Sequence, residues 1–286
     1  MKAITTSIFI LFILLFTACG NDAPAEESPQ NTPETVVPKT DSVQLPAENL
    51  PQTAEVSAPA KSTSSPTQKI NVSVNKNYLL GKFQYESHPD FVKVEKAHTN
   101  RYGEAYLRKE AYDAFKNMYD AAKKEGITLI IISATRDFDR QKEIWNGKWT
   151  GKYANVAGAE KRAIEILTYS SMPSTSRHHW GSDMDLNSLN NPYFEEGEGK
   201  KIYDWLVAHG NEYGFCQPYT PKGSQRPNGY NEEKWHWSYM PLSKPFLNQY
   251  LSTITLDDIS GFEGSEVKTA LNVIAHYVGG VNGGCK

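Results

Sequence analysis

Residues 176–185 read SRHHWGSDMD and place His178 and Asp185 seven residues apart, on either side of Gly181. We expect the histidine on a turn and the aspartate on the strand that follows, because glycine lets the backbone fold tightly between them. Histidine and aspartate are both zinc ligands, and a catalytic zinc takes three protein ligands with a fourth position left for water. The segment therefore predicts two of three metal ligands.

Residues 233–237 (EKWHW) supply the third ligand as His236, which we expect on a second strand. Glu233 precedes it by three residues, so its carboxylate could act as general base toward the attacking water and then pass the proton to a leaving amine. Bound zinc lowers the pKa of such a water to about 7. The two segments together predict a zinc hydrolase, and the other histidines, His179 included, are interpreted as structural.

The N-terminus predicts export. Residues 1–18 contain a lysine near the start and an apolar run from 8 to 16, as in a secretory signal peptide. The run is shorter than the roughly 20 residues that a transmembrane helix needs. It ends in LFTACG, which resembles a bacterial lipobox and implies lipidation of Cys19. We expect a lipoprotein anchored to a bacterial cell membrane, periplasmic or at the cell surface; the alternative is an ordinary signal peptide with an incidental cysteine.

Residues 19–75 are rich in Pro, Ser, Thr, Glu and Ala and predict a disordered acidic tether. Residues 76–286 have a formal net charge of zero and no internal repeat, and they are numerous enough for one domain with its own core. No basic patch indicates nucleic-acid binding, and we expect a monomer. Cys216 and Cys285 could form a disulfide in an oxidising compartment or remain two free thiols.

Hydrophobic periodicity indicates an α+β domain. Expected helices cover 106–124, 139–145, 157–169, 199–213, 243–251 and 263–277, and expected strands cover 127–133, 235–239 and a short segment after residue 214. This order favours segregated helices and strands over a βαβ-wound sheet. Trp235 and Trp237 would alternate with His236 and point into the core.

Both site segments resemble those of the VanY-like zinc D-alanyl-D-alanine carboxypeptidases, which share the fold of the Hedgehog signalling domain. The matching motifs are Ser176-x-His178-x-x-Gly181-x-x-x-Asp185, Glu233-x-Trp235-His236-Trp237, and Ser133-Ala134-Thr135-Arg136 with Gln141. The resemblance implies a central, mainly antiparallel sheet flanked by helices. It implies zinc on His178, Asp185 and His236, with Glu233 as base. Arg136 would stabilise the oxyanion or hold the peptide, while Ser176 and Gln141 would line the substrate cleft.

Three positions depart from the family's pattern. Asp183 stands where the family usually has a small residue, and it could hydrogen-bond a ligand histidine or take part in substrate binding. Thr135 replaces an aromatic residue and Ala134 replaces glycine. These departures leave the metal ligands intact and leave the peptide specificity open.

The expected function is removal of the terminal D-alanine from peptidoglycan stem peptides by a zinc-dependent carboxypeptidase. An L,D-carboxypeptidase or a peptidoglycan endopeptidase would use the same chemistry on another substrate. A non-catalytic wall-binding module that keeps zinc for stability is an alternative of a different class. Glu233 argues against that module, because a structural zinc site needs no base and closes its fourth position.

Overall fold

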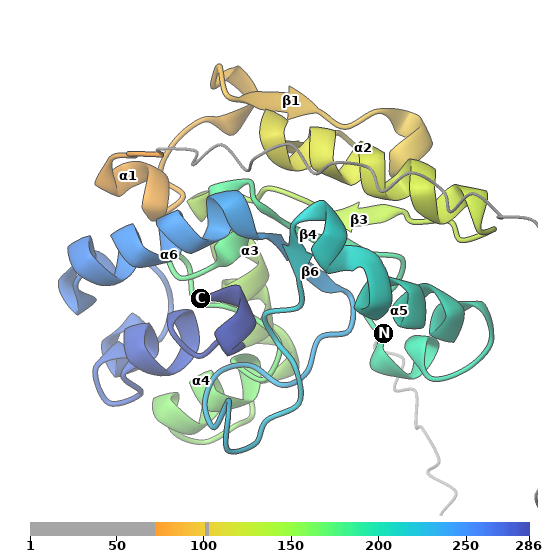
Figure 1. Cartoon of the computed structure of the whole chain (residues 1–286). Helices are drawn as coiled ribbons and strands as arrows, with labels where there is room; N and C mark the ends of the chain where they lie inside the picture. The colour runs from red at the N-terminus through yellow and green to blue at the C-terminus, as the bar shows by residue number, and fades with distance from the viewer. Residues whose placement is uncertain (1–71, 101–102) are drawn as a thin grey trace, which may run out of the picture. The chain divides into compact units, whose positions relative to one another are not determined.

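The computed structural model describes residues 72–100 and 103–286 (Figure 1). The predicted signal peptide, Cys19 and nearly all of the predicted tether lie outside these residues. Val74 already contacts the domain, because its backbone N–H donates to Oε1 of Gln249 at 3.1 Å. Val72 is also buried in the core, so the domain begins a few residues before the expected boundary at 76.

The central sheet is antiparallel throughout and brings distant parts of the chain together. Its strands are β3 (Ile131–Ser133), β4 (Asp183–Leu186), β6 (His236–Tyr239) and β5 (Phe215–Cys216), in that spatial order. In the register of β4 with β6, Asp185 lies opposite His236 and Asp183 lies opposite Ser238. A separate two-stranded sheet pairs β1 (Phe91–Lys93) with β2 (Tyr106–Arg108).

Helices surround the central sheet. They are α1 (Lys76–Leu79), α2 (Lys109–Lys124), α3 (Phe138–Gly147), α4 (Ala159–Ile166), α5 (Gly197–His209) and α6 (Met240–Thr253). Figure 1 shows α2 and β1 on one side of the sheet, with α6 and α5 toward its two ends and α4 on the remaining side. The predicted α+β class with a mainly antiparallel sheet flanked by helices is confirmed.

Alternation along the strands separates an apolar face from a functional face. Met184, Leu186 and Trp237 belong to a core that also contains Phe115 of α2 and Leu206 of α5. Side chains of successive strand residues point to opposite faces. The neighbouring acidic, histidine and serine residues of β4 and β6 therefore point to the other face, where the candidate site lies.

Three predicted elements need correction. Tyr106–Arg108 is a strand paired with β1 rather than the start of a helix, and the expected strand 127–133 is regular only over Ile131–Ser133. The helix expected over 263–277 is replaced by two short turns, a 3-10 turn at Ser265–Lys268 and a π-helical turn at Ile274–Val278. Asn272 separates them with a φ of 45°, which a continuous right-handed helix excludes.

Cys216 and Cys285 form a disulfide, with their Cα atoms 5.9 Å apart. Sequence reasoning left this pairing open. The bond ties the C-terminal end of the chain to β5, next to the central strand β6.

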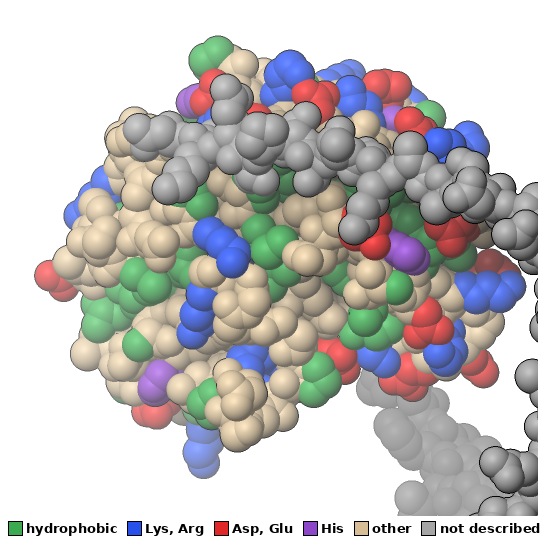
Figure 2. Space-filling model, viewed as in Figure 1, with side chains coloured by type: hydrophobic (Ala, Val, Ile, Leu, Met, Phe, Trp, Pro, Cys, Tyr) green, Lys and Arg blue, Asp and Glu red, His purple; other side chains and the backbone are tan. Residues whose placement is uncertain are grey.

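Charges of both signs are mixed on the face of the molecule that Figure 2 shows. Figure 2 shows Lys and Arg side chains interspersed with Asp and Glu on the face in view, without a field of one sign. This fits the zero formal charge of residues 76–286. No helix in the part of the chain that the structure describes is long and apolar enough to cross a bilayer.

Candidate metal centre and substrate pocket

A tight turn positions His178, the first of the three predicted metal ligands. His178 lies in a 3-10 turn over Arg177–Trp180, and Gly181 follows in the left-handed region with a φ of 72°. A Cβ at Gly181 would overlap the ring of Phe91, so only glycine fits this turn. The chain then enters β4, which carries Asp185.

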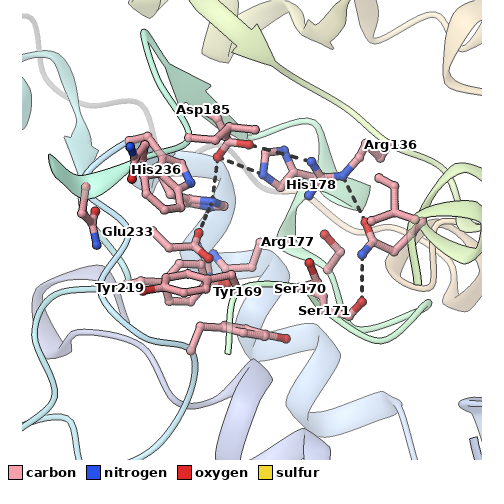
Figure 3. Close-up of a pocket in the computed structure, with 18 of the residues that line it drawn as sticks. Arg136, Tyr169, Ser170, Ser171, Arg177, His178, Asp185, Tyr219, Glu233 and His236 are labelled. Carbon is pink, nitrogen blue, oxygen red and sulfur yellow. Dashed lines mark hydrogen bonds and ion pairs between the residues drawn. The ribbon is translucent and has the colours of Figure 1, made fainter. Parts of the chain in front are cut away.

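His178, Asp185 and His236 converge as predicted, with one ligand atom from each lying within 4.8 Å of the others. Asp185 Oδ1 is 3.3 Å from His178 Nε2 and 3.1 Å from His236 Nδ1. All three side chains are buried (Figure 3).

In each histidine, one ring nitrogen faces Asp185, here called the inner nitrogen, and the other, the outer nitrogen, faces away from it. Both outer nitrogens lie beside hydrogen-bond acceptors. His178 Nδ1 lies 2.8 Å from the carbonyl oxygen of Ala134, and His236 Nε2 lies 3.0 Å from Oδ1 of Asp183. Because these partners accept, the nitrogens that face away from Asp185 carry protons, and the nitrogens that face Asp185 can bind an ion when the rings are neutral. This is the tautomer that a metal-binding histidine requires.

The surroundings of Asp185 Oδ1 indicate whether a metal ion would fit between the three residues. The atom is buried and has no hydrogen-bond partner, although two histidine nitrogens lie close to it. A divalent cation between these three buried atoms would take a ligand from each of them and give Asp185 Oδ1 a partner. Two imidazoles and one carboxylate are a ligand set typical of catalytic zinc. The residues therefore fit such an ion.

Asp183 supports His236 from behind. Its carboxylate is fully buried and accepts hydrogen bonds from Arg177 Nε at 2.9 Å, from the hydroxyls of Ser182 and Ser238, and from His236. Burial alone would raise the pKa of this carboxyl group, but Arg177 and His236 outweigh it and lower the pKa below its ordinary value. Asp183 is not among the cavity-lining residues, so its predicted place in substrate binding is corrected to the alternative role of holding a ligand histidine.

A cavity of about 380 Å³ opens onto the three ligands. The other residues that sequence reasoning placed there also line it, namely Arg136, Gln141, Ser176 and Glu233. The hydroxyl of Ser176 is buried without a hydrogen-bond partner, which leaves it available to a ligand. A cavity with a few convergent polar groups is the usual form of a small-ligand site.

Arg136 is fixed in place at one side of the ligands. Its Nε donates to Oε1 of Gln141 at 3.0 Å and its Nη1 donates to the hydroxyl of Ser133 at 2.8 Å. Gln141 in turn donates to the carbonyl of Ser171 at 2.8 Å. A register shift in β3 places Ser133 opposite Asp185, and Arg136 Nη1 lies 3.8 Å from Oδ2 of that aspartate. Gln141 therefore holds Arg136 in place and also lines the cavity, as predicted.

Glu233 lies on the other side, so that it and Arg136 flank His178 in Figure 3. Its Oε2 is 3.5 Å from His236 Nδ1, and the residue is only 6% exposed. Burial raises the pKa of the Glu233 carboxyl group, although His236 opposes this change. A sheltered carboxyl group beside the metal ligands is well placed to exchange a proton.

Several cavity residues had no sequence signal. They come from loops without motifs and include Tyr169, Ser170, Ser171, Asn190, Asn191, Tyr219 and Tyr230. Lys148 could have been predicted from the sequence as a cavity residue, because it follows Gln141 by seven residues and so lies on the same helical face. Trp237 packs in the core as predicted, whereas Trp235 also lines the cavity and contacts Tyr169.

Comparison with known proteins gives one family. Residues 104–242 match the family model VanY, described as D-alanyl-D-alanine carboxypeptidase. YodJ of Bacillus subtilis (strain 168), whose name includes the word carboxypeptidase, is 34% identical over 179 residues, or 60% of each chain. The D-alanyl-D-alanine carboxypeptidase of Enterococcus faecalis (strain ATCC 700802 / V583) is 27% identical over 146 residues, 48% of this chain and 53% of the relative. The chain thus spans little more than half the length of these two relatives.

Two solved structures are also similar. The LD-carboxypeptidase LdcB is 28% identical with a TM-score of 0.45, over 63% of this chain and 79% of that one. A mutant of the vancomycin-resistance D,D-pentapeptidase VanY in complex with Zn(II) is 21% identical with a TM-score of 0.44, over 62% of this chain and 90% of that one.

The fold and site bring together two histidines and an aspartate that could hold a metal ion, beside a buried glutamate in one cavity. Residues 104–242 are therefore similar to the VanY-like carboxypeptidases, and the two relatives above support the resemblance that the sequence motifs indicate.

Proposed function

We propose that this protein is a zinc-dependent D,D-carboxypeptidase that removes the terminal D-alanine from peptidoglycan stem peptides. The observation that carries the proposal is the buried Asp185 Oδ1, which has no hydrogen-bond partner and faces the inner nitrogens of His178 and His236. The D-alanyl-D-alanine carboxypeptidase description of the matching family model supports the choice of substrate.

Zinc held by the three ligands would polarise the scissile carbonyl and lower the pKa of a water molecule. Glu233 accepts a proton from the attacking water as the carbon–oxygen bond forms, and it delivers this proton to the leaving amine as the carbon–nitrogen bond breaks. The Arg136 guanidinium keeps its charge at all relevant pH values and stabilises the negative charge that develops on the carbonyl oxygen.

The test is hydrolysis of two defined peptides by the zinc-loaded chain. Muramyl pentapeptide and muramyl tetrapeptide are incubated separately and the product masses are followed, with chelator and Glu233→Gln as controls. We expect the loss of one alanine from the pentapeptide alone, abolished by both controls. Loss from the tetrapeptide alone would instead indicate an L,D-carboxypeptidase. Cleavage within a cross-linked peptide would indicate an endopeptidase, and zinc binding with no cleavage of any peptide would favour a wall-binding module.

We also propose that lipid on Cys19 anchors the protein to a bacterial membrane. The proposal rests on the LFTACG sequence at residues 15–20, which follows an apolar run. Expression of the wild type and of Cys19→Ala with a labelled fatty acid tests it. Only the wild type should carry the label and sediment with membranes, and label in the Cys19→Ala variant would contradict the proposal.

A further inference from the structure

A stripe of α3 forms one wall of the cavity. Gln141, Ile144 and Lys148 are spaced by three and four residues, and all three line the cavity. Such spacing places side chains on one helical face. Lys148 directly follows the last residue of α3 and still has right-handed helical backbone angles. It therefore lies on the same wall as Gln141, about 10 Å farther along the helix axis.

The ammonium group of Lys148 has a hydrogen bond but no counter-ion. Its Nζ donates to the hydroxyl of Ser170, and no carboxylate of residues 72–100 and 103–286 makes an ion pair with it. Lys234, which is also sheltered, pairs with Glu195 at 3.3 Å. Burial lowers the pKa of Lys148, and the positive charges of Lys152 and Arg136 lower it further, against a smaller opposing effect of the Glu233 carboxylate. An anion that enters the cavity would compensate for both effects.

Ser170 completes the arrangement. It is buried, lines the cavity and precedes Ser171, the residue whose carbonyl accepts the hydrogen bond from Gln141. Because its oxygen accepts from Lys148, its own hydroxyl hydrogen remains available to a ligand. An ammonium and a hydroxyl beside one cavity can both donate to a carboxylate, and the bond from the ammonium is charge-assisted.

We propose that Lys148 and Ser170 form a carboxylate-binding subsite for the peptide substrate, separate from the Arg136 position. This inference rests on the proposed function, because it assumes a peptide in the cavity. The carboxylate could be the terminal one of the peptide or one carried farther upstream. Both have the same chemistry, and amidation of each in turn distinguishes them.

The experiment measures peptide binding rather than turnover. The full zinc-loaded chain carries Glu233→Gln in every sample, so that the bound peptide stays intact, and Kd is measured by calorimetry. Four stem pentapeptides are compared: with all carboxylates free, with the terminal carboxylate amidated, with the upstream carboxylates amidated, and with both changes. Lys148→Gln removes the proposed contact. Lys152→Gln removes the same charge from an exposed neighbour that does not line the cavity and is the matched control.

For the fully charged peptide, Lys148→Gln should raise Kd about tenfold or more, as expected for loss of a charge-assisted hydrogen bond. Ser170→Ala should raise it less, and Lys152→Gln should leave it nearly unchanged. One of the amidated peptides should bind wild type and Lys148→Gln equally, which identifies the recognised carboxylate. The subsite would be overturned if Lys148→Gln raised the Kd of all four peptides equally, or if it raised the Kd of none of them.

Folding and the proposed function are judged separately. The thermal midpoint and the zinc content of Lys148→Gln show whether the variant is folded, and Ser170→Ala provides a second test if it is not. If the chain with Glu233 intact fails to hydrolyse the pentapeptide but the Kd pattern holds, the carboxypeptidase proposal fails and the subsite stands. If the chain hydrolyses the pentapeptide but the Kd pattern is absent, the carboxypeptidase proposal stands and the subsite fails.

Discussion

At the residue scale, two carboxylates share His236. Asp183 accepts the proton of Nε2, and Asp185 faces Nδ1 from the same side of β4. The first contact orients the ring, and the second holds it at the candidate metal position. Carboxylates that orient metal-binding histidines in this way raise the affinity for the metal.

We expect Asp183→Ala to lower zinc affinity by roughly 10- to 100-fold, because His236 loses the partner that orients it. The change should also destabilise the fold by about 3–5 kcal/mol, since Arg177 would remain as a fully buried and unpaired charge. Zinc titration and denaturant unfolding measure the two effects.

The double variant Asp183→Ala with Arg177→Met separates these effects. Removing both charges should recover much of the stability that Asp183→Ala loses, whereas zinc affinity should stay low. Recovery of zinc affinity together with stability would show that Asp183 acts on the fold alone.

At the element scale, the turn between residues 177 and 181 decides where His178 lies. Arg108, the residue before α2, donates its backbone N–H to the carbonyl oxygen of Gly181 at 3.0 Å. The ring of Phe91 fills the space beside this glycine. The small β1–β2 sheet therefore supports the turn that carries His178.

Gly181→Ala should destabilise the protein by more than the roughly 1–2 kcal/mol that a left-handed backbone costs a residue with a side chain. The additional cost comes from overlap with Phe91, and displacement of the turn should also reduce zinc binding. Gly126→Ala is the matched control, because Gly126 has a similar φ of 77° and no atoms within 4 Å of an added Cβ. Equal losses of stability from the two substitutions in denaturant unfolding would contradict this explanation.

A pair of charged residues at the junction of β2 and α2 should make the stability of the protein depend on pH. Glu110 accepts a hydrogen bond from Arg108 at 2.7 Å. Partial burial alone would raise the pKa of its carboxyl group, but Arg108 outweighs burial and the pKa is lowered. A carboxyl group with a lowered folded-state pKa contributes stability above its unfolded value of about 4.3 and loses it as the pH falls through the folded value.

Glu110→Gln should therefore destabilise the protein at pH 6 and have a smaller effect at about pH 3. Urea unfolding of wild type and variant at both pH values measures the difference. A cost that is the same at both values would indicate that the Arg108 interaction contributes no pH-dependent stability.

Helices and strands were predictable where one pattern dominated. Met184 and Asp185 alternate across β4, and Ala111, Phe115 and Met118 mark α2. Tyr106–Arg108 was misassigned because Leu107 fits both a helical and a strand pattern, and only pairing with β1 decides between them. The segment 263–277 was misassigned because a single positive φ at Asn272 interrupts otherwise helical spacing.

At the scale of the whole molecule, the disulfide joins the last residues to the central sheet. Cys216 and Cys285 are 69 residues apart in the sequence, and a cross-link of that span restricts the unfolded chain substantially. We expect Cys285→Ser to lower the free energy of unfolding by about 2–4 kcal/mol. Denaturant unfolding with and without reductant checks this, and a wild type insensitive to reductant would contradict it.

The candidate site was predictable in its ligands and less so in its walls. His178, Asp185, His236 and Glu233 follow from spacing and ligand chemistry within two short segments. Lys148 and Ser170 meet only after folding, because no local pattern links a helix end to a loop about 20 residues later. Asp183 had two plausible roles in the sequence, and only the register of β4 with β6 decides between them.

The most direct test of the central claim is zinc content measured together with pentapeptide hydrolysis in four proteins: wild type, His178→Ala, His236→Ala and Glu233→Gln. We predict one zinc per chain in wild type and in Glu233→Gln, and far less in the two histidine variants. Only wild type should release D-alanine. Full zinc content in His178→Ala or His236→Ala, or release of D-alanine by Glu233→Gln at the wild-type rate, would contradict the account.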